Sequence, residues 1–451
     1  MRRARLLLPL VSGLACLIAL AQPARTAERS VSALPAPTEV RLGNSSIPLT
    51  GPWKFTPGDS PYANGSPLWA SPAFDDAAWS NMDLHTRPVV KDPAYGTAGY
   101  LTGWTARGFP HLSGFAWYRL RLHLVNSSER LWLKMPDHTD DSYQVFANGR
   151  YIGEFGHFTP GGVDCYRSRP LTFQLPAPDS HGDILLAVRF YMEPFVLVSG
   201  STGDSGGMHQ APIAGMHAQI ESIRAQETTG RILSVITSMF VAFLMLIGAA
   251  GAFRLWILDR PGSTYLWLAL SLVFTAMPTA ILLAAFFSYA FTQAGANVLL
   301  QSLEVLGLVC WILFWRSWFH LAQNRWLDLL LSALGLAVIL TAIFFRFSGH
   351  APAPIILFIV GMRTVCNAAL GIMLLVALLQ GASKDRTGAL VALPPIILLA
   401  ISLLSGELLT WFHVRTSIFP SAFRSASRMS PWSCWYWLSA PWSHDALSAR
   451  R

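Results

Sequence analysis

The sequence predicts a chain in two parts: an N-terminal antiparallel β-sandwich, then an all-α bundle of transmembrane helices. Of its 451 residues, 52% are hydrophobic and only 13% are charged, a balance more apolar than that of ordinary soluble chains. Charged residues occur throughout residues 30–226, whereas residues 231–413 consist of long apolar runs separated by short charged loops. Short alternating segments bounded by Gly, Pro, Asn and Asp indicate strands in the first part.

The N-terminus is typical of an exported protein. Basic "MRRAR" precedes the apolar run Leu6–Ala21, and small residues follow in "ALAQPARTA". This order predicts a signal peptide over residues 1–27. The run is shorter than the roughly 20 residues that a membrane span needs, although an uncleaved anchor is the alternative.

The segment from 30 to 210 is predicted to be the extracytoplasmic β-sandwich. In "WYRLRLHL", alternation predicts one buried and one solvent-exposed face. The buried face would hold Tyr118, Leu120, Leu122 and Leu124, and the exposed face Arg119, Arg121 and His123. In "FANGRYIG", Asn148–Gly149 separates two strand-like runs, which is the strongest short signal for a β-hairpin.

Four segments of this part carry a resemblance to a known fold. In order they are "GPWKFTPGD", "FDDAAWS", "FAWYRLRL" and "DDSYQVFANGRYIGEFG". The order resembles that of jelly-roll, galactose-binding-like domains, including the sugar-binding domain of family 2 glycoside hydrolases. The matching residues are Trp53, Asp75, Asp76, Trp79, Trp117, Tyr118, Arg119, Asp141, Asn148, Gly149 and Gly153.

Joined to apolar helices, such a domain resembles the bacterial seven-transmembrane receptors with diverse intracellular signalling modules. This resemblance covers about residues 45–412. It implies a sensor whose sandwich binds an extracytoplasmic small molecule or carbohydrate, and whose helices pass the change to a cytoplasmic module. No cofactor is expected. The oligomeric state stays open, with a homodimer as one alternative.

Aromatic side chains in the Gly-rich stretch "AYGTAGYLTGWTARG" are the predicted ligand contacts. Exposed aromatic faces serve recognition, and loops commonly present them. The candidates are Tyr95, Tyr100 and Trp104. Core packing is instead expected for Trp53, Trp79 and Trp117.

No enzyme is predicted. A glycosidase needs two carboxylates, and Asp137, Asp140, Asp141 and Glu154 could supply them. However, "PDHTDDSY" is a polar turn before a strand, where Asp is favoured for local hydrogen bonds. His111, His138 and His157 lack a recognisable metal spacing, so no metal site is predicted, although a structural Ca²⁺ in the Asp-rich loops stays open. Cys165, the one cysteine of this part, is expected to be buried and inert.

Six apolar runs qualify as membrane spans. The first has a length of about 33 Å at ~1.5 Å per residue, enough for the hydrocarbon core. Lipid-exposed backbone at that depth must be helical. The runs are Ile232–Phe253, Tyr265–Phe287, Val298–Phe319, Leu327–Phe345, Ile355–Leu379 and Ala389–Phe412.

The loops between these runs predict the orientation. Positive residues favour the cytoplasmic side, and they follow the first, third and fifth runs. We therefore expect a multi-pass protein of the inner (plasma) membrane whose sandwich lies in the periplasm. The net charge of +8 has the same explanation, and no nucleic-acid partner is predicted. The basic residues that follow the first, third and fifth runs are Arg254, Arg260, Arg316, Arg325, Lys384 and Arg386.

Glu304, Arg363 and Glu407 are ionisable residues in the interior of the runs, away from their ends. A charge at the bilayer centre costs on the order of 2.5–3.5 kcal/mol on insertion scales, so Arg363 is expected to pair with one of the two glutamates. Such a pair could couple movements of the helices or simply bridge them. Repeated halves and paired broken helices are lacking, which disfavours a transporter.

Two segments flank the bundle. Residues 211–230 are predicted to form a stalk in which Gln219–Glu227 extends the first helix outward. Residues 414–451 form an irregular tail rich in Ser, Arg and Trp, and we expect it to arise from a frameshift that removes a seventh span and the output module. A genuine disordered tail is the alternative. A membrane-anchored carbohydrate-binding protein and a transporter or channel are the rival functions.

Overall fold

The computed structural model describes residues 38–40, 45–86, 90, 99–110, 112–125, 130–194, 205–258, 262–322, 324–347 and 353–385. Several predicted features lie outside these residues. They are the signal peptide over 1–27, Tyr95, His111, Glu407, the sixth apolar run and the tail from 414 to 451.

The larger sheet has seven strands among the described residues. All neighbours pair antiparallel except β1, which runs parallel to β7. One edge of β7 is shared, since β3 pairs with residues 116–119 and β1 with residues 122–124. The strand order is β11 (Arg150–Phe155), β10 (Ser142–Ala147), β15 (Asp183–Met192), β7 (Gly114–Leu124), β3 (Trp53–Pro57) and β6 (Ser80–Met82), with β1 (Thr38–Val40) beside β7.

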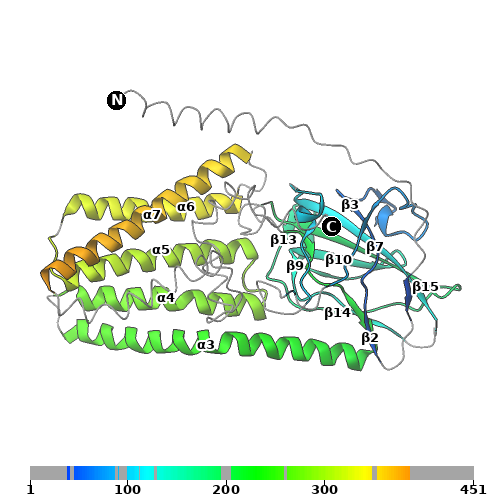
Figure 1. The fold of residues 1–451 in the computed structure, drawn as a ribbon, viewed down its shortest axis with the longest axis horizontal. Helices are drawn as coiled ribbons and strands as arrows, with labels where there is room; N and C mark the ends of the chain where they lie inside the picture. Colours follow the sequence, from blue (N-terminus) through cyan, green and yellow to red (C-terminus); the bar gives the residue numbers. More distant parts are fainter. Residues whose placement is uncertain are drawn as a thin grey trace, which may run out of the picture. The chain divides into compact units, whose positions relative to one another are not determined.

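A second sheet completes the sandwich (Figure 1). Its order is β14 (Thr172–Gln174), β8 (Trp132–Lys134), β17 (Ile213–Gly215) and β2 (Ser46–Pro48). One buried apolar cluster draws side chains from both sheets, among them Leu120 and Tyr143 from the larger and Leu133 and Ala214 from the smaller. The predicted β-sandwich is therefore confirmed.

Short elements lie between the strands of the two sheets. The 3₁₀ helices are η1 (Leu68–Ala70) and η2 (Trp104–Arg107). The short strand pairs are β4 (Tyr62–Ala63) with β5 (Ser66–Pro67), β9 (Thr139–Asp140) with β16 (Gly207–Met208), and β12 (His157–Thr159) with β13 (Gly162–Asp164).

The predicted hairpin is present. β10 and β11 pair antiparallel, and Ala147 lies opposite Arg150 across the turn. Asn148 has φ +50° and Gly149 φ +80°, which is the backbone that a two-residue type I′ turn needs. The Asn148 side chain also accepts a hydrogen bond from the Leu185 backbone at 2.8 Å, which ties the turn to β15.

The exposed face predicted for β7 is wrong at one position. Leu120, Leu122 and Leu124 are buried and Arg121 is exposed, as the alternation predicts. Arg119, in contrast, is 0% exposed and donates to Asp76 Oδ2 at 2.5 Å and to the Ser71 carbonyl at 2.8 Å. The reason is that the chain between β5 and β6 covers this face of the sheet.

Aromatic rings build that cover. Trp69, Phe74 and Trp79 contact one another, and Trp69 also meets Trp117 at 6.0 Å between ring centroids. Trp53 and Trp117 are fully buried, which confirms the core packing predicted for them, and Trp79 is half-buried.

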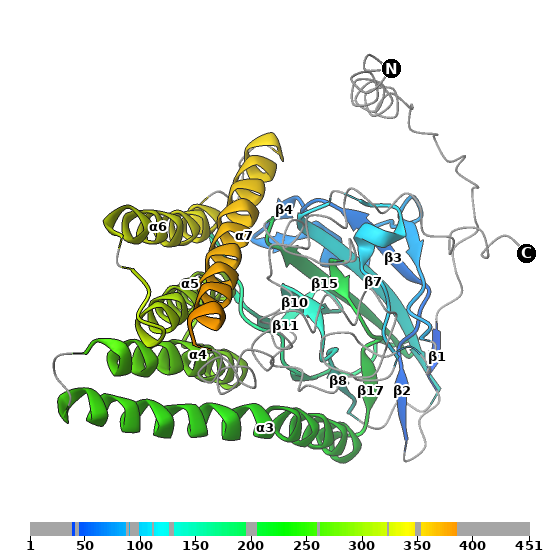
Figure 2. The same cartoon turned by 60° about the vertical axis from the view of Figure 1, so that its left-hand side comes forward.

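Five described helices are long and apolar enough to cross a membrane. Those next to each other in sequence pack side by side, and α7 also packs against α5 (Figures 1 and 2). Large apolar side chains such as Phe240, Phe243 and Phe358 are exposed on them, as expected where lipid is the solvent. The helices are α3 (His217–Leu258), α4 (Thr264–Phe287), α5 (Gln293–Trp318), α6 (Arg325–Phe347) and α7 (Ala353–Lys384).

Candidate functional site

The sandwich runs directly into the first membrane helix. Only Met216 separates the last residue of β17 from His217, where α3 begins. β17 pairs with both β8 and β2, so the sandwich extends beyond residue 210. Gln219–Glu227 is helical, as predicted. The backbone therefore joins the smaller sheet to α3 through a single residue.

Polar contacts join the first three turns of α3 to the smaller sheet. Lys134 of β8 forms an ion pair with Glu227 at 2.7 Å. Thr172 of β14 donates to Glu221 at 3.1 Å. Because Lys134 is only 2% exposed, this ion pair is desolvated, and such a charge is costly to leave without its partner.

A further contact lies where α3 enters its apolar part. Arg231 donates from Nε to Asp137 Oδ2 at 3.0 Å and from Nη2 to the Asp137 carbonyl at 2.7 Å. Its Nη1 donates to the Ser168 carbonyl at 2.8 Å. The Asp137 side chain is 1% exposed, so the guanidinium balances a buried carboxylate.

The start of α5 is tied to the sandwich as well. The Gln293 side chain donates to Asp141 Oδ1 at 3.0 Å, and its backbone N–H donates to the Cys165 carbonyl at 2.7 Å. The sandwich also contacts the loop before α5. Arg169 donates to the Ser288 carbonyl of this loop at 2.8 Å and lies 4.0 Å from the centre of the Tyr289 ring.

Residues 137–141 therefore contact three parts of the protein: α3, α5 and the segment at Gly206. Asp137 binds α3, Asp141 binds α5, and Asp140 between them accepts from the Gly206 backbone at 2.9 Å. Burial, together with the negative charge of Asp140, raises the pKa of Asp141 well above its usual range. For Asp140, burial acts in the same direction, but the charge and hydrogen bond of His209 outweigh it and lower the pKa to about 2.

Two histidines meet Asp140 at this place. His209 Nε2 lies 3.0 Å from Asp140 Oδ2, and His138 Nε2 lies 3.8 Å from Asp140 Oδ1. Among the described residues, these three form the group with metal-ligating atoms close together. The sequence predicted no metal site, because His138 and His209 are far apart in the chain. The alternation "HTD" on a strand was the available signal.

The predicted ligand-binding aromatics have different positions. Tyr100 is half-buried and stacks on His209, with 5.2 Å between ring centroids and 1° between planes. Trp104 is 0% exposed, packs against Phe55 in the core and donates to the Leu112 carbonyl at 3.0 Å. The Gly-rich stretch folds back onto the sandwich at Trp104, so this indole has no exposed face for a sugar.

The carboxylates considered for hydrolysis are used in contacts within the protein. Asp137, Asp140 and Asp141 have the partners given above, and Glu154 accepts from the Gln144 side chain at 2.8 Å. Cys165 is buried, as predicted.

Within the helices, Arg363 of α7 donates to Gln301 of α5 at 3.1 Å. It is 8% exposed, and Glu304, one turn after Gln301, lies within its electrostatic reach. This hydrogen bond links α7 to α5 through an amide, and the pairing of Arg363 with a glutamate stays a prediction.

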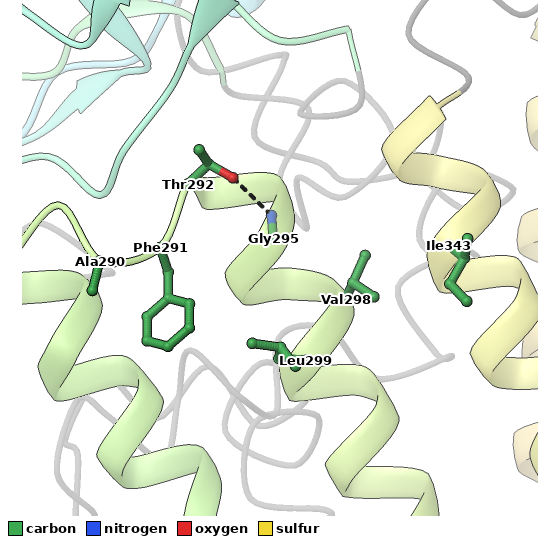
Figure 3. A pocket seen from close by; sticks show the side chains of 7 residues that line it. All are labelled: Ala290, Phe291, Thr292, Gly295, Val298, Leu299 and Ile343. Carbon is green, nitrogen blue, oxygen red and sulfur yellow. Dashed lines mark hydrogen bonds between the residues drawn. The ribbon is translucent and has the colours of Figure 1, made fainter.

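A pocket of about 460 Å³ opens where α5 begins. Figure 3 shows its seven lining residues, of which only Thr292 has a polar side chain, and that hydroxyl accepts from the Gly295 backbone at 3.2 Å. Sugar sites need several polar groups beside the apolar walls. This lining is therefore unsuited to a carbohydrate.

No protein-family model matches the chain, and no curated protein matches its sequence. Solved structures similar to it include a mutant of β-glucuronidase 2 from Bacteroides uniformis, with 22% identity over 38% of this chain and 18% of that one, and a TM-score of 0.25. A family 2 glycosyl hydrolase from Bacteroides cellulosilyticus has 14% identity over 38% and 20%, with a TM-score of 0.24. A likeness of this extent assigns no function.

Proposed function

We propose that this protein is a membrane receptor of the type with seven helices and diverse intracellular signalling modules. Its sandwich, of the jelly-roll, galactose-binding-like kind, binds an extracytoplasmic small molecule. The helices pass the resulting movement across the bilayer to a signalling output. The observation on which this depends is the direct passage from β17 into α3 with its buried contact between Arg231 and Asp137.

Buried charges support transmission rather than simple anchoring. An anchor needs only a flexible linker between a binding domain and its helix. Here, breaking the contact between Arg231 and Asp137 would leave a buried carboxylate without its partner, at a cost of about 3–5 kcal/mol. A ligand that shifts the smaller sheet therefore moves α3 with it more readily than it separates the two.

A carbohydrate is the first ligand class to test. The resemblance to galactose-binding-like domains suggests it. Among the predicted ligand-binding aromatics that the structure describes, Tyr100 keeps part of its side chain exposed. The charge pattern of the loops supports a plasma-membrane protein with its sandwich in the periplasm.

The test uses the full chain in lipid nanodiscs. Sugars are first screened by thermal unfolding, because a ligand that prefers the native state raises its apparent stability. Spin labels at Leu258→Cys and Trp318→Cys, in a background without native cysteines, then report the distance between the ends of α3 and α5.

We expect the ligand to change this distance in the otherwise native chain. In an Arg231→Met variant, the ligand should still bind, but the change should be lost. An anchored binding protein would bind with no change in either chain. A transporter, placed in sealed liposomes instead of nanodiscs, would move the sugar across the membrane. Either result would exclude the receptor.

A further inference from the structure

Strands β9 and β16 bring two histidines and an aspartate onto one face. The strands pair antiparallel with Thr139 opposite Met208, and the His209 backbone N–H donates to the His138 carbonyl at 3.1 Å. Side chains alternate along a strand, so His138 and Asp140 share a face with His209 across the pair. Thr139 and Met208 occupy the other face and are buried.

The three side chains converge on one point. Their nearest ligating atoms all lie within 4.8 Å of one another. A single transition-metal ion needs nitrogen and oxygen ligands at about 2.0–2.2 Å, which places those ligands some 3–3.5 Å apart. His209 Nε2 lies 3.0 Å from Oδ2 of Asp140 and His138 Nε2 lies 3.8 Å from its Oδ1, so small side-chain movements would complete the site.

The hydrogen bonds of His209 favour a cation at its Nε2. Its Nδ1 lies 2.8 Å from the Leu101 carbonyl, which only accepts, so Nδ1 bears the proton of the ring. If the ring carried only that proton, the lone pair of Nε2 would point at the Asp140 carboxylate, which also only accepts when ionised. Either an additional proton or a metal ion must separate the two. A backbone carbonyl on the far nitrogen is the usual support for a metal-binding histidine.

We propose that His138, Asp140 and His209 bind one divalent transition-metal ion of the Zn²⁺ class. Imidazole nitrogen suits Zn²⁺, Co²⁺ and Ni²⁺, whereas Ca²⁺ and Mg²⁺ require oxygen ligands. The side chains of His138 and Asp140 are 16% and 17% exposed, which leaves a path for the ion. Tyr100 closes one side, because its ring stacks on that of His209.

Such an ion would brace the segment that contacts both helices. Its ligands His138 and Asp140 lie between Asp137, which binds α3, and Asp141, which binds α5. The metal site does not depend on the proposed receptor function, since it would bind its ion in an anchor or a transporter equally.

The test is a Co²⁺ titration of the full, untagged chain in detergent, followed by visible absorption and by equilibrium dialysis. We expect one Co²⁺ per chain, displaced by Zn²⁺ and not by Ca²⁺. His138→Asn should weaken binding more than about 100-fold, because changes to outer hydrogen bonds alone cost up to 100-fold. Asp140→Asn tests a second ligand, since it keeps the shape of the side chain and one accepting oxygen but replaces the other oxygen of the carboxylate with an NH₂ donor, and it should also weaken binding.

The matched control is His123→Asn. His123 also pairs with an aspartate, Asp183, at 2.7 Å, but lies outside the metal-ligating group found among the described residues, and its loss should leave Co²⁺ binding unchanged. Binding to the wild-type chain that is no tighter than to the His138→Asn variant would overturn the proposal. The pair of His209 and Asp140 would then be held by a proton alone.

Discussion

Arg231 of α3 holds Asp137 through two groups at once, its Nε on the carboxylate at 3.0 Å and its Nη2 on the carbonyl at 2.7 Å. The contact joins Asp137, two residues before β9, to the helix that follows β17. At residues 137–141, the β9–β16 pair with its two histidines therefore meets α3 and α5.

Arg231→Ala should destabilise the chain by about 3–5 kcal/mol, since it leaves Asp137 buried and unpaired. The measurement is thermal or chemical unfolding in detergent. Arg224→Ala is the control on the same helix, because Arg224 forms a more exposed pair with Glu221 at 2.8 Å, and such pairs contribute about 0–1 kcal/mol. Equal losses in both variants would contradict the role of Asp137.

Gly206→Ala should disrupt the segment that presents His209. A Cβ there would lie 2.2 Å from the buried indole of Trp104, and the backbone has φ +97°. Overpacking typically costs about 1–3 kcal/mol, in addition to the strain of the left-handed backbone. Gly58→Ala measures that strain alone, because φ is +94° and nothing lies within 4 Å. An equal fall of the unfolding midpoint in both variants would show that the Trp104 ring moves to make room for the new methyl group.

Tyr143→Phe should reduce the loss of stability in alkali. Burial raises the pKa of Tyr143 well above its usual 10.0, so the folded chain keeps this proton where the unfolded chain releases it. The stabilisation is complete below pH 10 and declines above it, by about 1.4 kcal/mol per pH unit. The hydroxyl has no hydrogen-bond partner among the described residues, so its removal should cost little near neutrality.

Unfolding midpoints measured against pH give this slope. Tyr62→Phe, at a tyrosine that is 54% exposed, should leave it unchanged. A slope for Tyr143→Phe identical to that of the parent chain would contradict the effect of burial.

Cys165 should resist thiol reagents until the chain unfolds. The side chain is 0% exposed, and burial raises the pKa of its thiol well above the usual value, so little reactive thiolate forms. A variant that keeps Cys165 as its only cysteine should react orders of magnitude more slowly when folded than in denaturant. A single cysteine placed at exposed Tyr151 supplies the fast reference, and equal rates would disprove the burial.

Arg363→Leu should destabilise the bundle, and Glu304→Gln should restore part of the loss. Removing the guanidinium leaves Glu304 without the nearby positive charge, which costs several kcal/mol at this depth. Unfolding of the single and double variants gives the coupling energy directly. A double variant that loses the sum of the two single effects would show that the residues do not interact. Ligand binding by the sandwich should be unaffected.

Local patterns predicted much of the fold. The Asn148–Gly149 turn was readable because a two-residue hairpin needs positive φ at both positions, and the membrane helices because length and hydropathy are properties of a continuous segment. The buried face of β7 followed from alternation. Alternation predicted that Arg119 is exposed. This was wrong, because the segment that buries it lies some 45 residues away in sequence.

The chain by itself determined which segments form strands or membrane helices, since periodicity and apolar length act over a few neighbouring residues. The tertiary structure alone decided which side chains meet. Only the pairing of β9 with β16 brings His138, Asp140 and His209 together, and only the packing of α3 and α5 against the sandwich gives Asp137 and Asp141 their partners. Contacts between distant segments depend on register and packing, which no local pattern encodes.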